Sequence, residues 1–490
     1  MIFSEKLPLK VLQKMGAYPL VLKFTYTMSI QIKNERGRKI MIKSRAFLYI
    51  ILIIITIQGF NVHAQEAKAR WETLNLIRQE KLDIILPQAM RENDIDMWII
   101  VNRYGRFNPL SRELGGVGAS DKWYQGKFTA YLVFTDRGGD KIEQANIRDM
   151  TGALRKYVEE RDPKCIAVNM SEYLGSADGL SHTCYLALVK ALGKKYAERL
   201  VSSEMLVSDF RSRRVASEIA VFAKLAQLTV QLMERALSNE VIIPGVTTLG
   251  DVAFWVEDQL IALGHSPFLA AINPQTYSWP RIVYPEMPTT KDGRQIVRAP
   301  TGPYDRVIQR GDLVAWDGRI HMMGSYGTDI ERYAYVLREG EIDAPKTIKD
   351  AFEHGIKVRE LCRKLIKPGR TGLETLHLMY SKLKVHGYEI QYEEDKVTDS
   401  SNIEINIGCH SAGEQGPGSG AFIWIDRDQP FTSKLKLKPN QFHSFEFFLY
   451  YPLPEWGGKK LIWEFKENVI LTENGVELLS PQIEKILLIH

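Results

Sequence analysis

The sequence predicts an α/β protein in the broad sense: an α+β arrangement with a small N-terminal α/β domain and a larger second domain of two similar halves. Residues 66–210 alternate short apolar runs with helical periodicity, residues 311–337 have the pattern of a β-hairpin, and one Pro-Gly motif occurs twice. The predicted parts are an upstream extension (1–40), a leader (41–64), the N-terminal domain (65–210) and the second domain (211–490).

Composition and charge are those of a globular protein with an unusual leader. The 490 residues are 45% hydrophobic and 25% charged, which is enough for two domains with sizeable cores. The first 45 residues contain 10 Lys/Arg and 2 Asp/Glu, which leaves 54 against 57, a net charge of −3, for the rest of the chain. The basic charge therefore belongs to the leader, and we expect no nucleic-acid binding.

The leader has the layout of a secretory signal peptide. Lys43 and Arg45 precede an apolar run at 47–57, followed by Gly59 and by Val62, His63 and Ala64, after which we expect cleavage. The apolar run is short for a membrane span, so an uncleaved anchor is the alternative and no stable span is expected after cleavage. The sequence predicts export to the periplasm or the extracellular space. Residues 1–64 are therefore left out of the fold prediction.

The four cysteines, Cys165, Cys184, Cys362 and Cys409, have no zinc-site spacing. An exported protein could pair Cys165 with Cys184, but scattered cysteines in a large domain are more often free and buried. We expect no structural zinc.

The N-terminal domain is predicted from alternating elements. We expect helices at 66–93, 147–160 and 179–192 and strands at 97–101, 129–135 and 165–168. A long amphipathic helix at 212–239 then opens the second domain.

A repeat divides the second domain. Residues 242–249 read IIPGVTTL and residues 366–373 read IKPGRTGL; each follows a helix and precedes an amphipathic run. Chance similarity of Pro-Gly turns is the alternative, but the matching contexts favour two half-domains of like design. The paired strands are expected to form a curved sheet with helices outside it.

The hairpin at 311–337 presents Asp317 and Asp329 to one place. Two carboxylates that face one pocket repel each other unless a proton, a cation or a basic side chain lies between them. A divalent metal is one solution, and two ions could activate a bridging water. The alternative is that both acids are solvated at the turn.

The last third of the chain adds further polar residues. His410 lies in a glycine-rich loop, where a surface or otherwise satisfied histidine is the common alternative to a ligand. Glu446 interrupts an aromatic strand and is expected to face a polar pocket or a cation. Because strand side chains alternate, Glu464 and Lys466 share one face and Glu467 has the other.

With the repeat, the aspartate pair, His410 and Glu446 in that order, residues 66–490 resemble the creatinase, methionine aminopeptidase and Xaa-Pro aminopeptidase family. The phrases GDLVAWD, TDIERYAYVLREGE and LKPNQFHSFEFFLY carry the resemblance. It implies a creatinase-type N-terminal domain followed by a pita-bread domain with pseudo-twofold symmetry. It also implies a pair of divalent metals, such as manganese, cobalt, zinc or iron.

Carried over by position, the resemblance implies metal ligands at Asp317, Asp329, His410 and Glu446. It puts Lys466 where a second glutamate is expected, with Glu464 as the replacement if the strand slips by two residues. The spacing from Asp317 to Asp329 is one residue wider than usual, which predicts a bulge. The family's substrate-binding histidine has no clear counterpart in PQTYSWPRIVYP, residues 274–285.

Two functions follow from the resemblance. The first is an exported metal-dependent aminopeptidase or dipeptidase of the Xaa-Pro type acting on short peptides, in which His410 ligates metal or steadies the tetrahedral intermediate. The second is a pita-bread protein that has lost its metals and acts as a creatinase-like hydrolase or a binding scaffold; Lys466 favours it. Family members often form dimers, so the resemblance also implies a homodimer.

Overall fold

The computed structural model describes residues 31–33, 39–41, 66–103, 108, 110–115, 129–148, 152–264, 280–283, 305–323, 326–392, 401–413, 418–425 and 430–490. The chain divides into two compact units, residues 1–71 and 72–490. In the first unit β1 (Gln31–Lys33) pairs antiparallel with β2 (Lys39–Met41). The predicted leader beyond Met41 lies outside the described residues. Among the residues described, no helix is long and apolar enough to cross a membrane.

An α/β region occupies the first part of the second unit. Its first described helical residues, 72–80, continue as η1 (Lys81–Ile85) and α4 (Leu86–Glu92). The sheet has the order β5-β4-β3-β6-β7, with antiparallel pairs among β3, β4 and β5 and parallel pairs among β3, β6 and β7. Its strands are β3 (Met97–Arg103), β4 (Thr129–Thr135), β5 (Glu143–Arg148), β6 (Ile166–Val168) and β7 (Leu200–Ser202). Its other helices are α5 (Leu110–Glu113), α6 (Ala153–Arg161), η3 (Gly175–Ala177), α7 (His182–Leu192), α8 (Lys194–Ala197) and α9 (Glu204–Ser212).

Two helix predictions in this region are corrected. The predicted helix at 147–160 begins only at Ala153, because residues up to Arg148 form β5 and pair with β4. The predicted helix at 212–239 is shorter at both ends: α9 ends at Ser212, and α10 spans Ala216–Ala236. The backbone N–H of Arg214 donates to the carbonyl of Asn440 at 2.7 Å, so it bonds to a distant segment instead of continuing a helix. Tertiary pairing overrides local periodicity at both places.

Apart from β10 (His321–Met322) and β11 (Tyr326–Gly327), which form a two-stranded sheet of their own, the remaining described strands form two sheets. The first has the order β19-β12-β9-β8 and the second β13-β14-β16-β17-β18, with β15 paired to β16. The strands are β8 (Pro280–Val283), β9 (Leu313–Gly318), β12 (Ile330–Val336), β13 (Glu389–Ile390), β14 (Glu404–Ile407), β15 (His410–Ser411), β16 (Phe442–Pro452), β17 (Lys460–Thr472), β18 (Gly475–Leu478) and β19 (Leu487–Ile489). The expected single curved sheet is therefore two sheets. Side-chain hydrogen bonds between residues of β12 and β17 join them.

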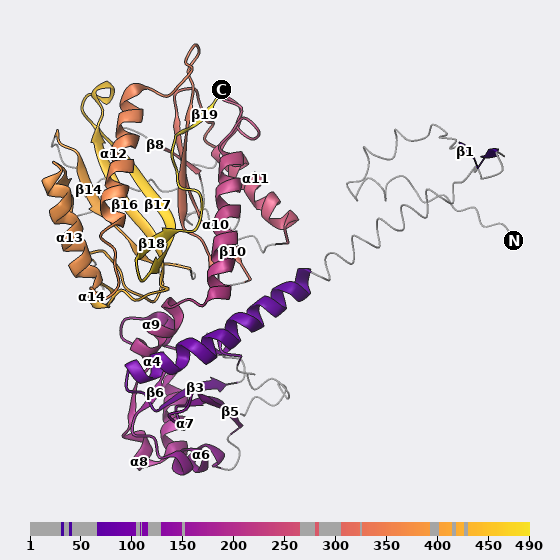
Figure 1. Ribbon diagram of the computed structural model, residues 1–490, viewed down its shortest axis with the longest axis vertical. Helices are drawn as coiled ribbons and strands as arrows, with labels where there is room; N and C mark the ends of the chain where they lie inside the picture. Colours follow the sequence, from indigo (N-terminus) through magenta and orange to yellow (C-terminus); the bar gives the residue numbers. More distant parts are fainter. Residues whose placement is uncertain are drawn as a thin grey trace. The chain divides into compact units, whose positions relative to one another are not determined.

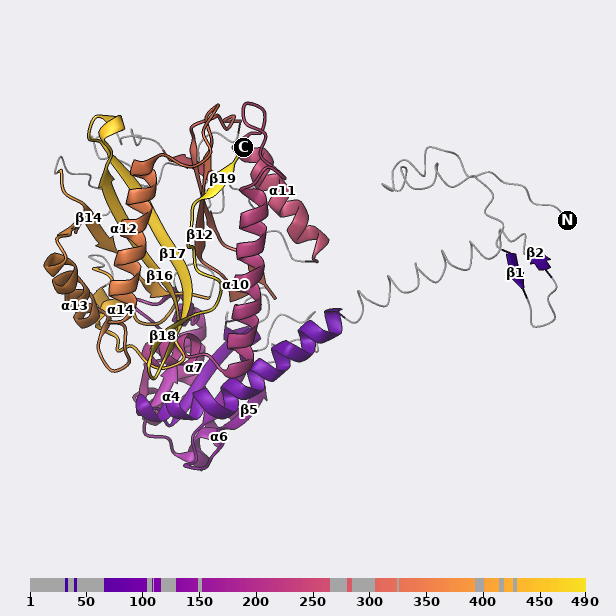
Figure 2. The ribbon, with the colours of Figure 1, turned by 45° about the horizontal axis from the view of Figure 1, so that its top comes forward.

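Helices cover the sheets, as Figures 1 and 2 show. Helices α10 and α11 (Leu249–Ala262) pack on Val314, Trp316 and Ala334 of β9 and β12. Helices α12 (Lys346–Arg363) and α13 (Gly372–Val385) pack against the aromatic side chains of β16 and β17. Two shorter helices, α14 (Pro430–Lys434) and η4 (Pro454–Trp456), complete the described helices.

The Pro-Gly repeat is visible in the structure. Each copy links two helices, α10 to α11 and α12 to α13, and ends in a capping box. The N-cap residues are Thr248 and Thr371, which accept from the backbone N–H groups of Asp251 and Glu374 at 3.1 Å in both cases. The turn of the first copy is one residue longer, so the structural match puts Thr248 on Thr371 and not on Gly372. Both halves use the same capping chemistry to begin a helix.

The predicted hairpin is confirmed, and the predicted bulge is not found in its described part. Pairing runs in step from Leu313↔Tyr335 to Gly318↔Ile330 and continues in step between β10 (His321–Met322) and β11 (Tyr326–Gly327). Residues 324 and 325, between the two strands of this pair, lie outside the described residues. Met323 there has a φ of 52°.

A glycine in the second copy of the repeat permits a close backbone contact. A Cβ atom on Gly372 would lie 1.7 Å from the carbonyl oxygen of Phe422. We expect Gly372→Ala to lower the free energy of unfolding by about 1–3 kcal/mol, because the backbone would have to move. Gly175→Ala is the control, since nothing lies within 4 Å of its added Cβ. Urea unfolding measures both, and equal stabilities would contradict the proposed close packing.

Candidate functional site

The predicted site residues meet at one buried place. Asp317 lies near the end of β9, Asp329 precedes β12, His410 begins β15 and Glu446 lies in the middle of β16. Each of the four is 5% exposed or less, so the two aspartates are not solvated turn residues. Strand alternation turns Val314 and Trp316 to the helix side and leaves Asp317 on the other face.

Lys466 of β17 lies among the acids. Its Nζ is 3.0 Å from Asp317 Oδ2, 3.5 Å from Asp329 Oδ1, 3.5 Å from Glu446 Oε2 and 2.8 Å from Glu464 Oε1. The lysine is 1% exposed. Burial would lower its pKa, but the carboxylates of Asp317, Asp329, Glu446 and Glu464 outweigh burial and hold the pKa well above its ordinary value. Lys466 is therefore an ammonium ion at the centre of the site.

The register places Lys466 there. Glu446 and Lys466 are paired directly across β16 and β17, and Glu464 faces Phe448. Glu464 and Lys466 both point into the site, whereas Glu467 lies on the other face, where it accepts from Arg332 at 3.2 Å. No slip brings Glu464 to the position of Lys466.

His410 bridges two of the acids. Its Nε2 is 3.2 Å from Asp329 Oδ2 and 3.3 Å from Glu446 Oε2. Burial acts to lower the pKa of His410, but hydrogen bonds to these two carboxylates outweigh it and raise the pKa to about 9. Ligand atoms of Asp329, His410 and Glu446 lie within 4.8 Å of one another, which is close enough for all three to bind one metal ion.

Arg319 is a second cation that the sequence prediction missed. Its Nε donates to Asp329 Oδ1 at 3.1 Å and its Nη2 to Asp329 Oδ2 at 3.3 Å. Burial would raise the pKa of Asp329, but the charges of Lys466 and Arg319 hold it well below its usual range. Arg319 follows Asp317 by two positions. In an extended chain such residues point to the same side, so Arg319 could have been inferred from the sequence.

A second group of charges extends the site. Arg281 of β8 pairs with Glu331 of β12 and lies 3.2 Å from Glu464 Oε2. Burial raises the pKa of Glu331 well above its ordinary value in spite of Arg281. Glu331 could be inferred from its position two residues after Asp329, but Arg281 stands alone in its sequence segment and carries no such signal.

Asn468 fixes the acid-bearing strands to each other. Its Oδ1 accepts from the backbone N–H of Asp329 at 3.0 Å, and its Nδ2 donates to the carbonyl of the same residue at 3.1 Å. These two side-chain bonds thus take the place of backbone hydrogen bonds between the strands at this point. They hold Asp329 beside Lys466.

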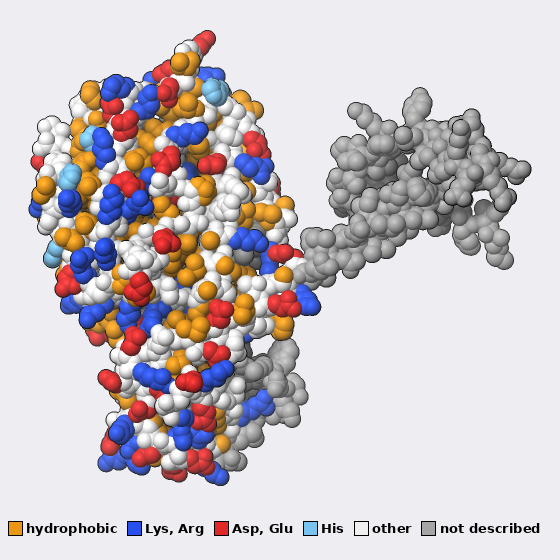
Figure 3. Space-filling model, viewed as in Figure 1, with side chains coloured by type: hydrophobic (Ala, Val, Ile, Leu, Met, Phe, Trp, Pro, Cys, Tyr) orange, Lys and Arg blue, Asp and Glu red, His pale blue; other side chains and the backbone are white. Residues whose placement is uncertain are grey.

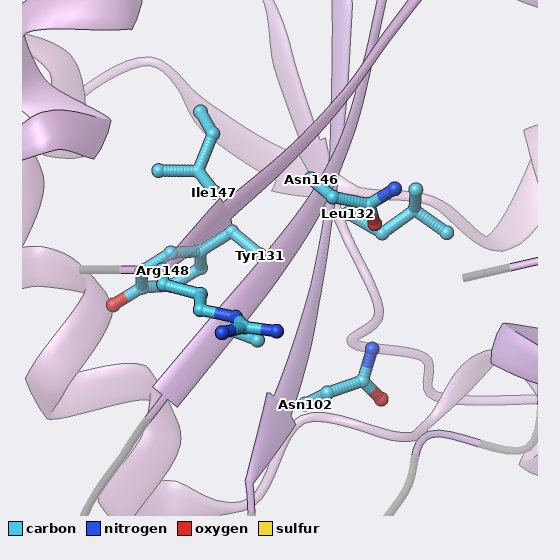
Figure 4. A pocket seen from close by; sticks show the side chains of 7 residues that line it. Asn102, Tyr131, Leu132, Asn146, Ile147 and Arg148 are labelled. Atoms are coloured by element: carbon cyan, nitrogen blue, oxygen red, sulfur yellow. The ribbon is translucent and has the colours of Figure 1, made fainter. Parts of the chain in front are cut away.

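A separate cavity lies on the N-terminal sheet (Figure 4). It has a volume of about 440 Å³ and is lined by residues of β3, β4 and β5: Asn102, Ala130, Tyr131, Leu132, Asn146, Ile147 and Arg148. None of the predicted site residues lines it.

All four cysteines are free; Cys165 is half-buried and the other three are buried. Figure 3 shows acidic and basic side chains interspersed over the described part of one face.

The comparisons with known proteins decide the family. The model of metallopeptidase family M24 matches residues 221–476, more than half of the chain. The chain belongs to metallopeptidase family M24. The predicted pita-bread relationship and the metallopeptidase class are thereby confirmed. No curated protein matches the chain.

Solved structures of the M24 fold agree with this assignment. An X-Pro aminopeptidase from Thermotoga maritima is 16% identical with a TM-score of 0.53, and covers 82% of this chain and 99% of its own. A Xaa-Pro dipeptidase from Bacillus anthracis is 17% identical with a TM-score of 0.52, and covers 84% and 99%. A dipeptidase from Pyrococcus horikoshii is 15% identical with a TM-score of 0.51, and covers 83% and 99%. These likenesses support the fold of this M24 protein.

We expect Lys466→Met to destabilise the protein by about 3–5 kcal/mol, because it leaves buried carboxylates without their central cation. Guanidinium unfolding at neutral pH measures the change. Lys346→Met is the matched control: this lysine pairs with Asp350 at 2.6 Å, but its side chain is 84% exposed, so about 0–1 kcal/mol is expected. A Lys466→Met protein as stable as the control would mean that the ammonium does not neutralise these acids.

Proposed function

We propose that the protein is a hydrolase of the Xaa-Pro type that acts on short peptides and works with at most one divalent ion. The observation that carries the proposal is the position of Lys466, within 3.5 Å of Asp317, Asp329 and Glu446. These are acids that the resemblance assigns to metal ligands. Membership in the M24 family supports peptide hydrolysis, and the lysine limits the number of ions.

The donor set fits one ion better than two. Asp329, His410 and Glu446 would hold it, since two carboxylates and an imidazole suit manganese, cobalt, zinc or iron. A bound ion of this kind polarises a carbonyl and lowers the pKa of water. A second ion would need Asp317 and a fifth oxygen ligand. Lys466 is present at that fifth position, and its ammonium lies 3.0 Å from Asp317.

Other residues of the chain prepare the site for hydrolysis. His410 Nε2 lies between Asp329 and Glu446, so it can ligate metal or steady the oxyanion of a tetrahedral intermediate. Lys466 donates to Asp317 Oδ2 at 3.0 Å, and Asn468 holds the backbone of Asp329. Water exclusion strengthens each of these interactions, because the residues are buried.

A metal-free role is the second candidate, and a specific observation favours it. Each acid of the site already contacts a protein cation: Lys466 contacts Asp317, Asp329, Glu446 and Glu464, and Arg281 pairs with Glu331. A creatinase-like hydrolase or a binding scaffold needs no more than this. Metal content distinguishes the two candidates.

We expect protein purified without chelator to contain at most about one divalent ion per chain. Lys466→Glu supplies a fifth carboxylate in place of an ammonium, so it should raise both the metal content and the rate of Xaa-Pro cleavage. Metal analysis and a peptide assay with added manganese measure these. About two ions in the unmodified protein would contradict the lysine substitution. No gain in either quantity would favour the metal-free role.

The proposal extends to the organisation and location of the chain. The second unit then consists of two domains that meet near residue 210. A five-stranded sheet confined to residues 97–202 and two sheets confined to residues 280–489 support this division. The leader at 41–64 directs export, and the resemblance supports a homodimer. Short peptides in the exported compartment are then the substrates.

We expect the mature protein to begin at Gln65. N-terminal sequencing of protein recovered from the culture medium or periplasm measures this directly. A start before Gln65 would contradict the proposed cleavage site, and recovery in the membrane fraction would favour the uncleaved anchor.

A further inference from the structure

Arg319 contacts Asp329, one of the three residues that could hold a metal ion. It comes two residues after Asp317. The β9–β12 and β10–β11 pairs have the same register, which places Arg319 opposite Asp329 in the hairpin. Its guanidinium contacts both oxygens of Asp329, at 3.1 and 3.3 Å, and its side chain is 16% exposed. A planar guanidinium that meets both oxygens of a carboxylate is a strong and oriented pair.

The oxygens of Asp329 are fully engaged by protein groups. Oδ1 accepts from Arg319 and lies 3.5 Å from Lys466 Nζ, while Oδ2 accepts from Arg319 and lies 3.2 Å from His410 Nε2. Asp317 differs, because its Oδ1 is buried and accepts no hydrogen bond within the described part of the chain. An ion that binds Asp329 therefore competes for its oxygens with the guanidinium, which cannot lose its charge at any accessible pH.

The nearby carboxylates also keep the Arg319 guanidinium at this position. The negative charges of Asp329, Asp317 and Glu446 oppose the effect of burial on Arg319 and raise its pKa. The same three acids surround Lys466. The two side chains thus share one set of carboxylates, one entering from β17 and the other from the end of β9.

We propose that Arg319 is a built-in competitor for the one divalent ion, so that it weakens metal binding at Asp329, His410 and Glu446. This inference rests on the proposed function, because it concerns the ion which that function uses. Lys466 blocks the second ion, and Arg319 sets the affinity for the first. Metal binding is then coupled to movement of one arginine away from Asp329.

Manganese binding to the whole protein tests the proposal. Titration with Mn²⁺, followed by the electron paramagnetic resonance signal of the free ion, gives the number of ions and their affinity. We expect Arg319→Gln to tighten binding at one site by about tenfold or more, because the charge-assisted fork to Asp329 is lost. Arg338→Gln is the control, since this arginine pairs with Glu341 and its side chain is 61% exposed.

A second variant covers a failure of Arg319→Gln to fold. Arg319→Lys keeps the charge but cannot form the fork, and we expect a smaller gain in Mn²⁺ affinity. The melting temperature should also rise more with Mn²⁺ in either variant than in the unmodified protein, because a ligand stabilises the state that binds it more tightly. Unchanged or weaker Mn²⁺ binding in both variants would overturn the proposal.

The peptide assay separates this inference from the proposed function. Tighter Mn²⁺ binding without cleavage of Xaa-Pro peptides would support the role of Arg319 and contradict the hydrolase. Cleavage with unchanged Mn²⁺ affinity would support the hydrolase and overturn the role of Arg319.

Discussion

The buried ammonium of Lys466 is the interaction on which the rest of this site depends. Asp317, Glu446 and Glu464 come from three strands in two sheets, and all lie within 3.5 Å of one ammonium nitrogen, so their charges would repel one another without it. A cation 3.0 Å from Asp317 and 2.8 Å from Glu464 makes that convergence stable. It also joins the sheets, because Lys466 belongs to β17 and Asp317 to β9.

A fixed ammonium differs from a metal ion in what it allows. It neutralises charge and donates three hydrogen bonds, but it offers no coordination position for water. It also cannot be removed by a chelator or exchanged for another ion. The M24 fold of this chain therefore has a centre whose charge balance depends on protein side chains, with Arg319 and Arg281 at its edges.

The two halves of the domain explain how the acids reach this centre. Capping boxes at Thr248 and Thr371 begin α11 and α13, and in each half a helix pair covers an apolar strand face. Because strand side chains alternate, the covered face dictates that every second residue points the other way. Asp317 and Lys466 lie on these opposite faces, so apolar packing on one side positions charged groups on the other.

The sequence by itself determined the hairpin and the repeat, and its family resemblance pointed to Asp317, Asp329, His410, Glu446 and Lys466 as residues of one site. Strand alternation is a local property, and it places Asp317 on one face and Lys466 beside Glu464 without knowledge of the fold. Tertiary structure decided the rest. The break before α10, the pairing of Arg148 within β5 and the two separate sheets depend on distant segments that local periodicity does not encode. The same holds for Arg281 and Asn468, because a partner's identity follows from register across strands, and register is set by the packing of the whole domain.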